Sequence, residues 1–129
     1  MPATQEALKL LQKALPALAK QLPKLWPLLL EARNREKLMA IMRDLASASP
    51  QRKLAARMEA TELLAEKLSE EAEEEQERQR ATEWRSRERK MRARLDMPVE
   101  GVKARREHRA SLHDDMAALH KEMSEALRD

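Results

Sequence analysis

Leucines recur at alternating steps of three and four residues near the start of the chain. Such steps place side chains on one face of an α-helix, so the pattern predicts a helix with a continuous apolar stripe. Pro16, Pro23 and Pro27 interrupt this segment, and an interior proline costs a helix about 3 kcal/mol. Because Pro16 and Pro23 lie away from the leucines, we expect a helix over residues 4–30 that is kinked but not broken. The stripe consists of Leu8, Leu11, Leu15, Leu18, Leu22, Leu25 and Leu29.

A second apolar stripe predicts a helix over residues 33–46. Ser49 followed by Pro50 then predicts the start of a third helix, because a serine hydroxyl caps free backbone N–H groups and proline is tolerated in a first turn. No glycine or proline follows until after Asp96. The sequence therefore predicts an uninterrupted helix of about 46 residues, about 70 Å long.

The apolar seam of this long helix changes direction along its length. Its first half keeps a heptad seam up to Ala72, and Ala81 is the only apolar residue in the next stretch. When the pattern resumes at Trp84 it has slipped by two positions, a rotation of roughly 200°. Because one partner helix cannot follow both seams, we expect the first half to pack on the N-terminal helices and the second half elsewhere.

A last apolar seam predicts a C-terminal helix over residues 102–127. The short connection before it contains Pro98 and Gly101, which favours an antiparallel pairing with the end of the long helix. The predicted fold class is all-α: an elongated helical bundle with one long charged helix and a coiled-coil-like C-terminal hairpin. We expect two units, an N-terminal helical unit over residues 1–70 and a charged continuation with the hairpin over residues 71–129.

The composition agrees with helices and excludes several kinds of chemistry. The chain lacks Phe, Tyr and Cys, has only three Val or Ile residues, and is 38% charged. Strand-forming residues are therefore scarce, and the absence of cysteine excludes disulfides and thiolate chemistry. The longest apolar run is far shorter than the roughly 20 residues that cross a bilayer. We expect a cytoplasmic protein, with attachment to a membrane surface as the alternative.

Charge is distributed unevenly along the predicted long helix. Glutamates dominate residues 62–77, and arginines dominate residues 78–94. Charge runs of this kind are usually solvated helix faces. Two copies crossing antiparallel near Arg78 would also match the acidic half of each with the basic half of the other, with Ala72 facing Trp84. The predicted partner is therefore a second copy or another helical protein.

Two other binding surfaces are weighed against this hypothesis. The arginines of residues 78–109 could neutralise nucleic-acid phosphates, with Trp84 stacking on a base, but intervening glutamates dilute the charge and make this the weaker hypothesis. The segment 8–30 could lie on an anionic membrane surface, although burial in a core explains it better. The membrane-facing residues would be Leu8, Leu11, Leu15, Leu18, Leu22, Leu25, Trp26 and Leu29.

The sequence offers little support for catalysis or metal binding. His113 and His120 lie on one helix face but about 10 Å apart, too far for one ion, so we expect surface histidines. Ser111 is near His113 but points to another face, and Gly101 is the only glycine, so there is no phosphate loop. We expect no enzyme activity, cofactor, metal or small-molecule substrate.

The sequence thus favours a non-enzymatic helical assembly or adaptor protein that acts through coiled-coil-like contacts between proteins. Charges at the rim of such contacts set partner choice and association rate more than affinity. The predicted contact residues, within a hairpin or with a partner, are Trp84, Met91, Leu95, Leu112, Met116 and Leu119, with Arg85, Arg89 and Arg92 for electrostatic matching.

Overall fold

The computed structural model describes residues 2–128, with side chains from residue 5 onward, and over this range it contains helices and no strand. The all-helical prediction is confirmed. Two short 3₁₀ turns, Pro16–Leu18 and Ala32–Asn34, flank the second helix. The helices are α1 (Pro2–Ala14), α2 (Leu22–Leu29), α3 (Arg35–Leu45), α4 (Pro50–Glu71), α5 (Glu75–Asp96) and α6 (Val102–Leu127).

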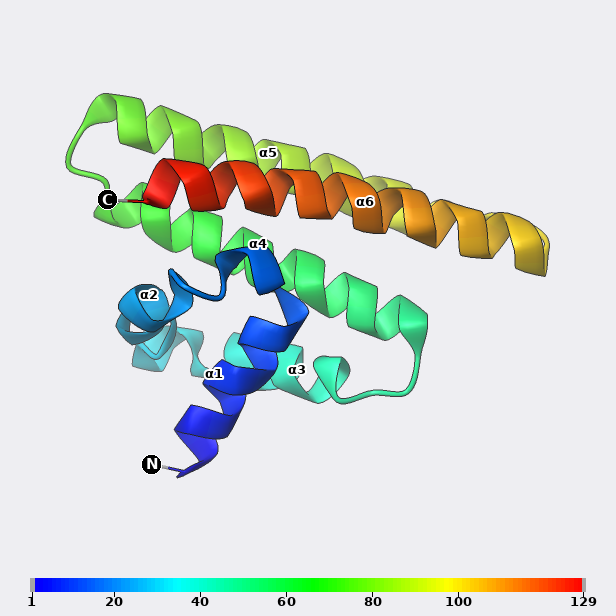
Figure 1. Ribbon diagram of the computed structural model, residues 1–129, viewed down its shortest axis with the longest axis horizontal. Helices are drawn as coiled ribbons and strands as arrows, with labels where there is room; N and C mark the ends of the chain where they lie inside the picture. The colour runs from blue at the N-terminus through cyan, green and yellow to red at the C-terminus, as the bar shows by residue number, and fades with distance from the viewer. Residues whose placement is uncertain (1, 129) are drawn as a thin grey trace.

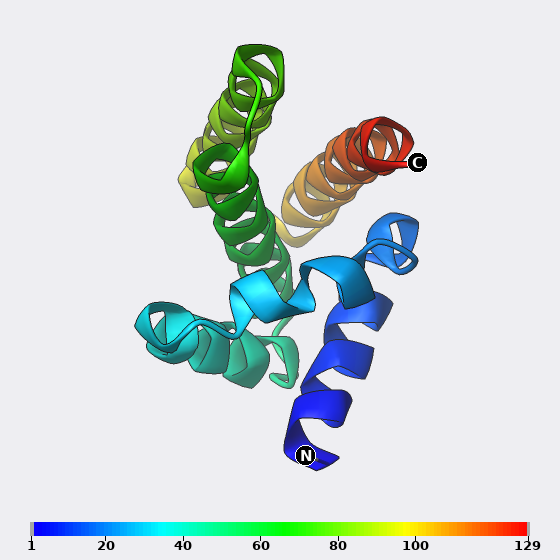
Figure 2. The same cartoon turned by 90° about the vertical axis from the view of Figure 1, so that its left-hand side faces the viewer.

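Helix α4 lies at the centre of the molecule, with α1, α2 and α3 on one side and α5 and α6 on the other (Figures 1 and 2). Its position explains its sequence, because apolar or small residues are buried on several of its faces. Helix α5 runs back along α4, and α6 then returns beside α5 (Figure 1). The buried residues of α4 include Leu54, Ala56, Met58, Ala60, Leu63, Leu64 and Ala65.

The leucine segment is broken, which corrects the prediction of one kinked helix over residues 4–30. Helix α1 ends at Ala14, and Leu15 leaves the helical region with φ −124° and ψ 65° because it precedes Pro16. The chain then turns before α2 begins. The Gln12 side chain fastens this turn by donating a hydrogen bond to the Ala19 carbonyl at 2.9 Å.

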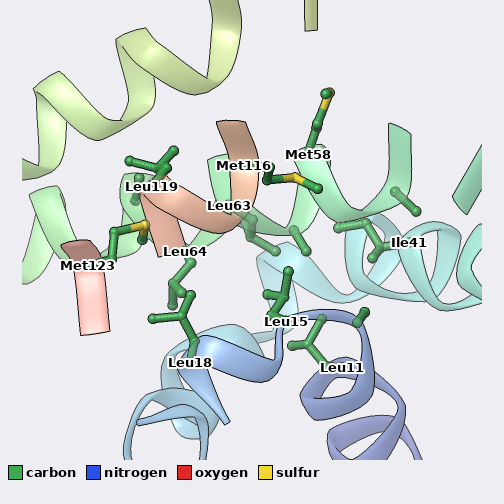
Figure 3. Close-up of a cluster of buried hydrophobic side chains, with 14 of the residues drawn as sticks. Leu11, Leu15, Leu18, Ile41, Met58, Leu63, Leu64, Met116, Leu119 and Met123 are labelled. Atoms are coloured by element: carbon green, nitrogen blue, oxygen red, sulfur yellow. The ribbon is translucent and has the colours of Figure 1, made fainter. Parts of the chain in front are cut away.

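The break does not expose the leucine stripe, because the leucines before and after it both face α4. Figure 3 shows Leu11, Leu15 and Leu18 against Leu63, Leu64 and side chains of α6. Leu8 and Leu25 are partly buried at the edge of the same core. The stripe is therefore a packing face in this fold, as the core interpretation predicts. The buried residues of the stripe are Leu11, Leu15, Leu18, Leu22 and Leu29, and the neighbouring Trp26 is buried as well.

The start of α4 follows the sequence prediction, but its end does not. The Ser49 hydroxyl accepts a hydrogen bond from the Arg52 backbone N–H at 3.2 Å, so the predicted cap is confirmed. The predicted uninterrupted helix over residues 50–96 is wrong, because Ala72 and Glu74 adopt extended conformations and the chain reverses there. Neither glycine nor proline marks this turn.

The reversal lets the acidic half of the segment meet its basic half within one chain. Glu62 of α4 pairs with Arg89 of α5 at 3.2 Å and with Arg85 at 3.5 Å. Glu59 pairs with Arg92 at 3.0 Å. The charge matching that we predicted between two copies is thus made internally, and association of copies stays a prediction. The division into residues 1–70 and 71–129 also stays a prediction.

Helix α6 is joined to α5 by residues 97–101 and held along it by polar contacts. Gly101 has φ 95°, a left-handed conformation that side-chain-bearing residues rarely adopt. Arg94 pairs with Asp115 at 2.7 Å, and the His108 ring donates to the Arg94 carbonyl through Nε2 at 2.7 Å. Together with an ion pair between Arg87 and Glu122, these contacts hold α6 antiparallel to α5.

Candidate functional site

The apolar residues predicted to contact a partner lie inside the fold. Trp84, Met91 and Leu95 face the core from α5, and Leu112, Met116 and Leu119 face it from α6. The predicted electrostatic residues Arg85, Arg89 and Arg92 pair with carboxylates of the same chain. These residues therefore form intramolecular contacts. The six apolar side chains are buried, whereas Arg89 stays exposed and Arg85 and Arg92 are partly exposed beside their carboxylate partners.

The tryptophans are also enclosed. Trp84 is 3% exposed, and the Arg80 guanidinium lies 5.2 Å from the centre of its ring. Trp26 is 7% exposed. A buried indole cannot stack on a nucleotide base, so the stacking predicted for Trp84 is wrong for this conformation.

A different surface stands out between the N-terminal segment, α4 and α6, where two cavities adjoin. One cavity, of about 240 Å³, opens between the end of α1 and α6, and the other, of about 320 Å³, opens between the start of α4 and α6. Arg57 and His113 line both, so we treat them as one feature, the basic cleft. Its polar lining residues are Lys13, Lys53, Arg57, Arg109, His113 and His120.

The basic cleft has no internal counter-charge. No aspartate or glutamate is among the described residues that line it. Along α5 the arginines face carboxylates of α4 and α6, whereas no ion pair among side chains 5–128 involves the four Lys and Arg residues of the cleft. The Arg57 Nε is buried and has no hydrogen-bond partner among these residues. The cleft therefore concentrates positive charge that a bound anion can neutralise.

His120 lines the cavity between α1 and α6 and is 3% exposed, which corrects the expectation of surface histidines. The Thr61 hydroxyl donates its proton to the Arg57 carbonyl at 2.8 Å. The hydroxyl oxygen of Thr61 therefore accepts a hydrogen bond from His120 Nε2 at 2.7 Å. Burial, together with the nearby Arg57 and His113, lowers the pKa of His120 to about 4. His120 is therefore neutral at pH 7 and stands in the positive field of its neighbours.

This arrangement does not activate a nucleophile. A general base must accept the hydroxyl proton, but the Thr61 proton goes to a backbone carbonyl, and His120 acts as the donor. Within the part of the chain that is described, no three His, Asp or Glu side chains gather to hold a metal ion. None of the helices over this part is long and apolar enough to cross a membrane.

A second unusual group, Glu88, lies in the packing face of α5. Glu88 is 1% exposed, and neither of its carboxyl oxygens has a hydrogen-bond partner among the described residues. Burial, together with the nearby Glu62, raises the pKa of Glu88 to about 8. The signal was in the spacing, since Glu88 continues the helical face of Ala81 and Trp84.

The cleft itself was not predicted from the sequence. Its residues come from α1, α4 and α6, which are distant in the chain, and nothing in the local pattern indicates that they meet. The nearest signal was the spacing of His113 and His120 on one face. Comparison of the chain with protein-family models, curated proteins and solved structures gives no match.

Proposed function

We propose that this protein is a non-enzymatic helical adaptor that binds an acidic segment of a partner protein in the basic cleft. The single observation that carries the proposal is the contrast between paired and unpaired cations. The arginines of α5 are matched with carboxylates inside the chain, whereas the cations of the cleft are not. Uncompensated charge in a concave surface attracts an opposite charge and speeds its association.

A protein segment suits this surface better than a nucleic acid. Proteins that bind single strands combine basic grooves with exposed aromatic side chains, and both tryptophans are buried here. The chain contains no other aromatic residue besides histidine. Several arginines of residues 78–109 are also engaged with Glu59, Glu62 and Asp115, which leaves less charge for phosphates.

The membrane alternative receives less support. In this fold the apolar side of residues 8–30 packs into the core, so membrane insertion would require this segment to detach. A cytoplasmic location stays a prediction. Coiled-coil-like packing of α5 on α6 also belongs to the proposal, supported by the contacts of Arg94 with Asp115 and of Arg87 with Glu122.

The proposal is tested by the fluorescence anisotropy of a labelled glutamate-rich peptide mixed with the full chain. We expect saturable binding that weakens roughly tenfold between about 50 mM and about 300 mM salt, because the contacts are electrostatic. The double variant Lys53→Gln and Arg109→Gln removes two cleft charges and weakens binding by a further factor of about five to ten.

The matched control is the double variant Arg78→Gln and Arg106→Gln, which removes the same charge outside the cleft. We expect it to bind the peptide within a factor of about two of the parent protein. Absence of binding at low salt, or equal losses in the two double variants, would show that the basic cleft is not a binding surface for acidic segments.

A further inference from the structure

We infer that the inner corner of the basic cleft, formed by Lys13, Arg57, His113 and His120, is a binding site for a phosphate group carried on a protein segment. This inference rests on the proposed function, since it names the chemical group that the cleft recognises. The corner corresponds to the cavity of about 240 Å³ between the end of α1, α4 and α6.

The corner gathers its basic side chains from three separate helices. Lys13 lies in the last turn of α1, Arg57 lies in the middle of α4, and His113 lies on α6. A phosphate monoester carries three acceptor oxygens and a charge near −2, so it can accept hydrogen bonds from several directions at once. A carboxylate has two oxygens and one charge, and it satisfies such a site less completely.

Arg57 is the central residue of this corner. Its Nε is buried without a partner, while its neighbours in the cavity include no carboxylate. A guanidinium presents donors in a fixed fork that matches two phosphate oxygens. Because the Nε itself is almost inaccessible, the donors available to a bound phosphate are the two terminal nitrogens of the guanidinium.

His120 lines the same cavity as Arg57 and His113. Burial is the main cause of its lowered pKa, and Arg57 and His113 act in the same direction. A bound dianion would reverse that effect and favour protonated rings. The volume also suits a group of a few atoms, since cavities that enclose drug-sized ligands measure about 300 to 1,000 Å³.

The first test uses inorganic phosphate as the probe. Histidine ring resonances of the full chain are followed by NMR as phosphate replaces chloride at constant ionic strength. We expect saturable shifts at His113 and His120, smaller changes at His108, and an upward movement of the pKa of His120. Linear, equal shifts of all three histidines would overturn the inference.

Variants locate the effect. Arg57→Gln should weaken phosphate binding at least tenfold, whereas Arg57→Lys should retain part of it because the charge stays. Arg106→Gln, on the same helix as His113 but outside the cavity, should leave binding unchanged. Equal binding by the parent protein and Arg57→Gln would overturn the assignment of Arg57, and circular dichroism of each variant confirms that it is folded.

The second test separates this inference from the proposed function. The glutamate-rich peptide is compared with the same peptide carrying one phosphoserine, and we expect the phosphorylated form to bind at least fivefold more tightly. If both forms bind equally and phosphate does not compete, the phosphate site is wrong while the adaptor proposal stands. If neither form binds, both are wrong. Tighter binding to phosphatidic acid vesicles than to the phosphopeptide would overturn the protein source of the phosphate.

Discussion

Glu88 offers a sensitive test of the packing in this fold. Its carboxyl is buried in the packing face of α5 with neither oxygen hydrogen-bonded among the described residues, and burial raises its pKa from 4.5 to about 8. The perturbation is Glu88→Gln, which keeps the size and polarity of the side chain but removes its ionisation. Because the charged form is disfavoured only in the folded state, the substitution should change how stability depends on pH.

The sign follows from proton binding in the two states. Between pH 4.5 and about pH 8 the folded protein keeps a proton on Glu88 that the unfolded chain has released. The free energy of unfolding therefore falls as pH rises through this range, and the effect is complete above it. His120 acts oppositely below pH 6.5, because its pKa is lowered to about 4 and the unfolded chain binds the extra proton.

Between pH 6.5 and 8 the pH dependence of stability therefore comes mainly from Glu88, because His120 contributes mostly below pH 6.5. In this interval the folded state binds one proton more than the unfolded state, which changes the free energy of unfolding by about 1.4 kcal/mol per pH unit. Over about 1.5 pH units the loss of stability is about 2 kcal/mol. The assay is urea unfolding followed by circular dichroism at pH values across the interval. We expect the parent protein to lose about 2 kcal/mol and Glu88→Gln to lose almost none.

Glu83→Gln is the matched control, because Glu83 is exposed on the same helix. This variant should keep the pH dependence of the parent protein. If the parent protein and Glu88→Gln show the same slope, Glu88 does not hold a proton in the folded state and the raised pKa is wrong.

Three further predictions concern single positions. His120 should keep the NMR signals of a neutral ring down to about pH 5, and half protonation near pH 6.5 would contradict its burial. Ser49→Ala should lower the free energy of unfolding by about 1 kcal/mol through loss of the cap, whereas the exposed Ser86→Ala should change it by less than about 0.5 kcal/mol, both by urea unfolding. Leu15→Ala should lower the free energy of unfolding by about 3 kcal/mol in the same assay. Leu30→Ala, at a side chain that is 40% exposed, should lower it by less than about 1 kcal/mol. Similar losses in the two variants would disprove the core position of Leu15.

The helices and much of the core were predictable because their signals are local. Ser49 and Pro50 mark a helix start through chemistry that acts within one turn, and the leucine stripe marks a buried face through its spacing. The break at Pro16 was underestimated. A residue before proline is driven out of the helical region, and Leu15 shows that this local effect outweighed the apolar periodicity on either side.

The reversal between α4 and α5 was harder to predict because no glycine or proline marks it. Its cause is distributed: the glutamates of residues 70–77 repel one another at helical spacing, and like charges four apart destabilise a helix. The slipped seam was a second signal. A turn at Ala72 lets both seams face one core, which a straight helix cannot do. The basic cleft required this reversal and was therefore beyond the sequence argument.

The whole fold depends on the reversal of the chain after α4, which lets α5 pack along α4 of the same molecule. The Gln51 side chain donates to the Leu95 carbonyl at 3.4 Å, which brings the two ends of this pair together. The chain has no native cysteine, so Arg52→Cys and Met97→Cys provide exposed positions for two spin labels. Pulsed electron paramagnetic resonance, with the labelled protein diluted in unlabelled protein, measures the distance within one chain.

If α5 packs along α4, the two labels lie less than about 25 Å apart, since packed helix axes are about 8–10 Å apart and the labels add their own length. Dilution should leave this distance unchanged. A separation of about 68 Å, the length of an unbroken helix of 45 residues at about 1.5 Å per residue, would contradict the reversal of the chain.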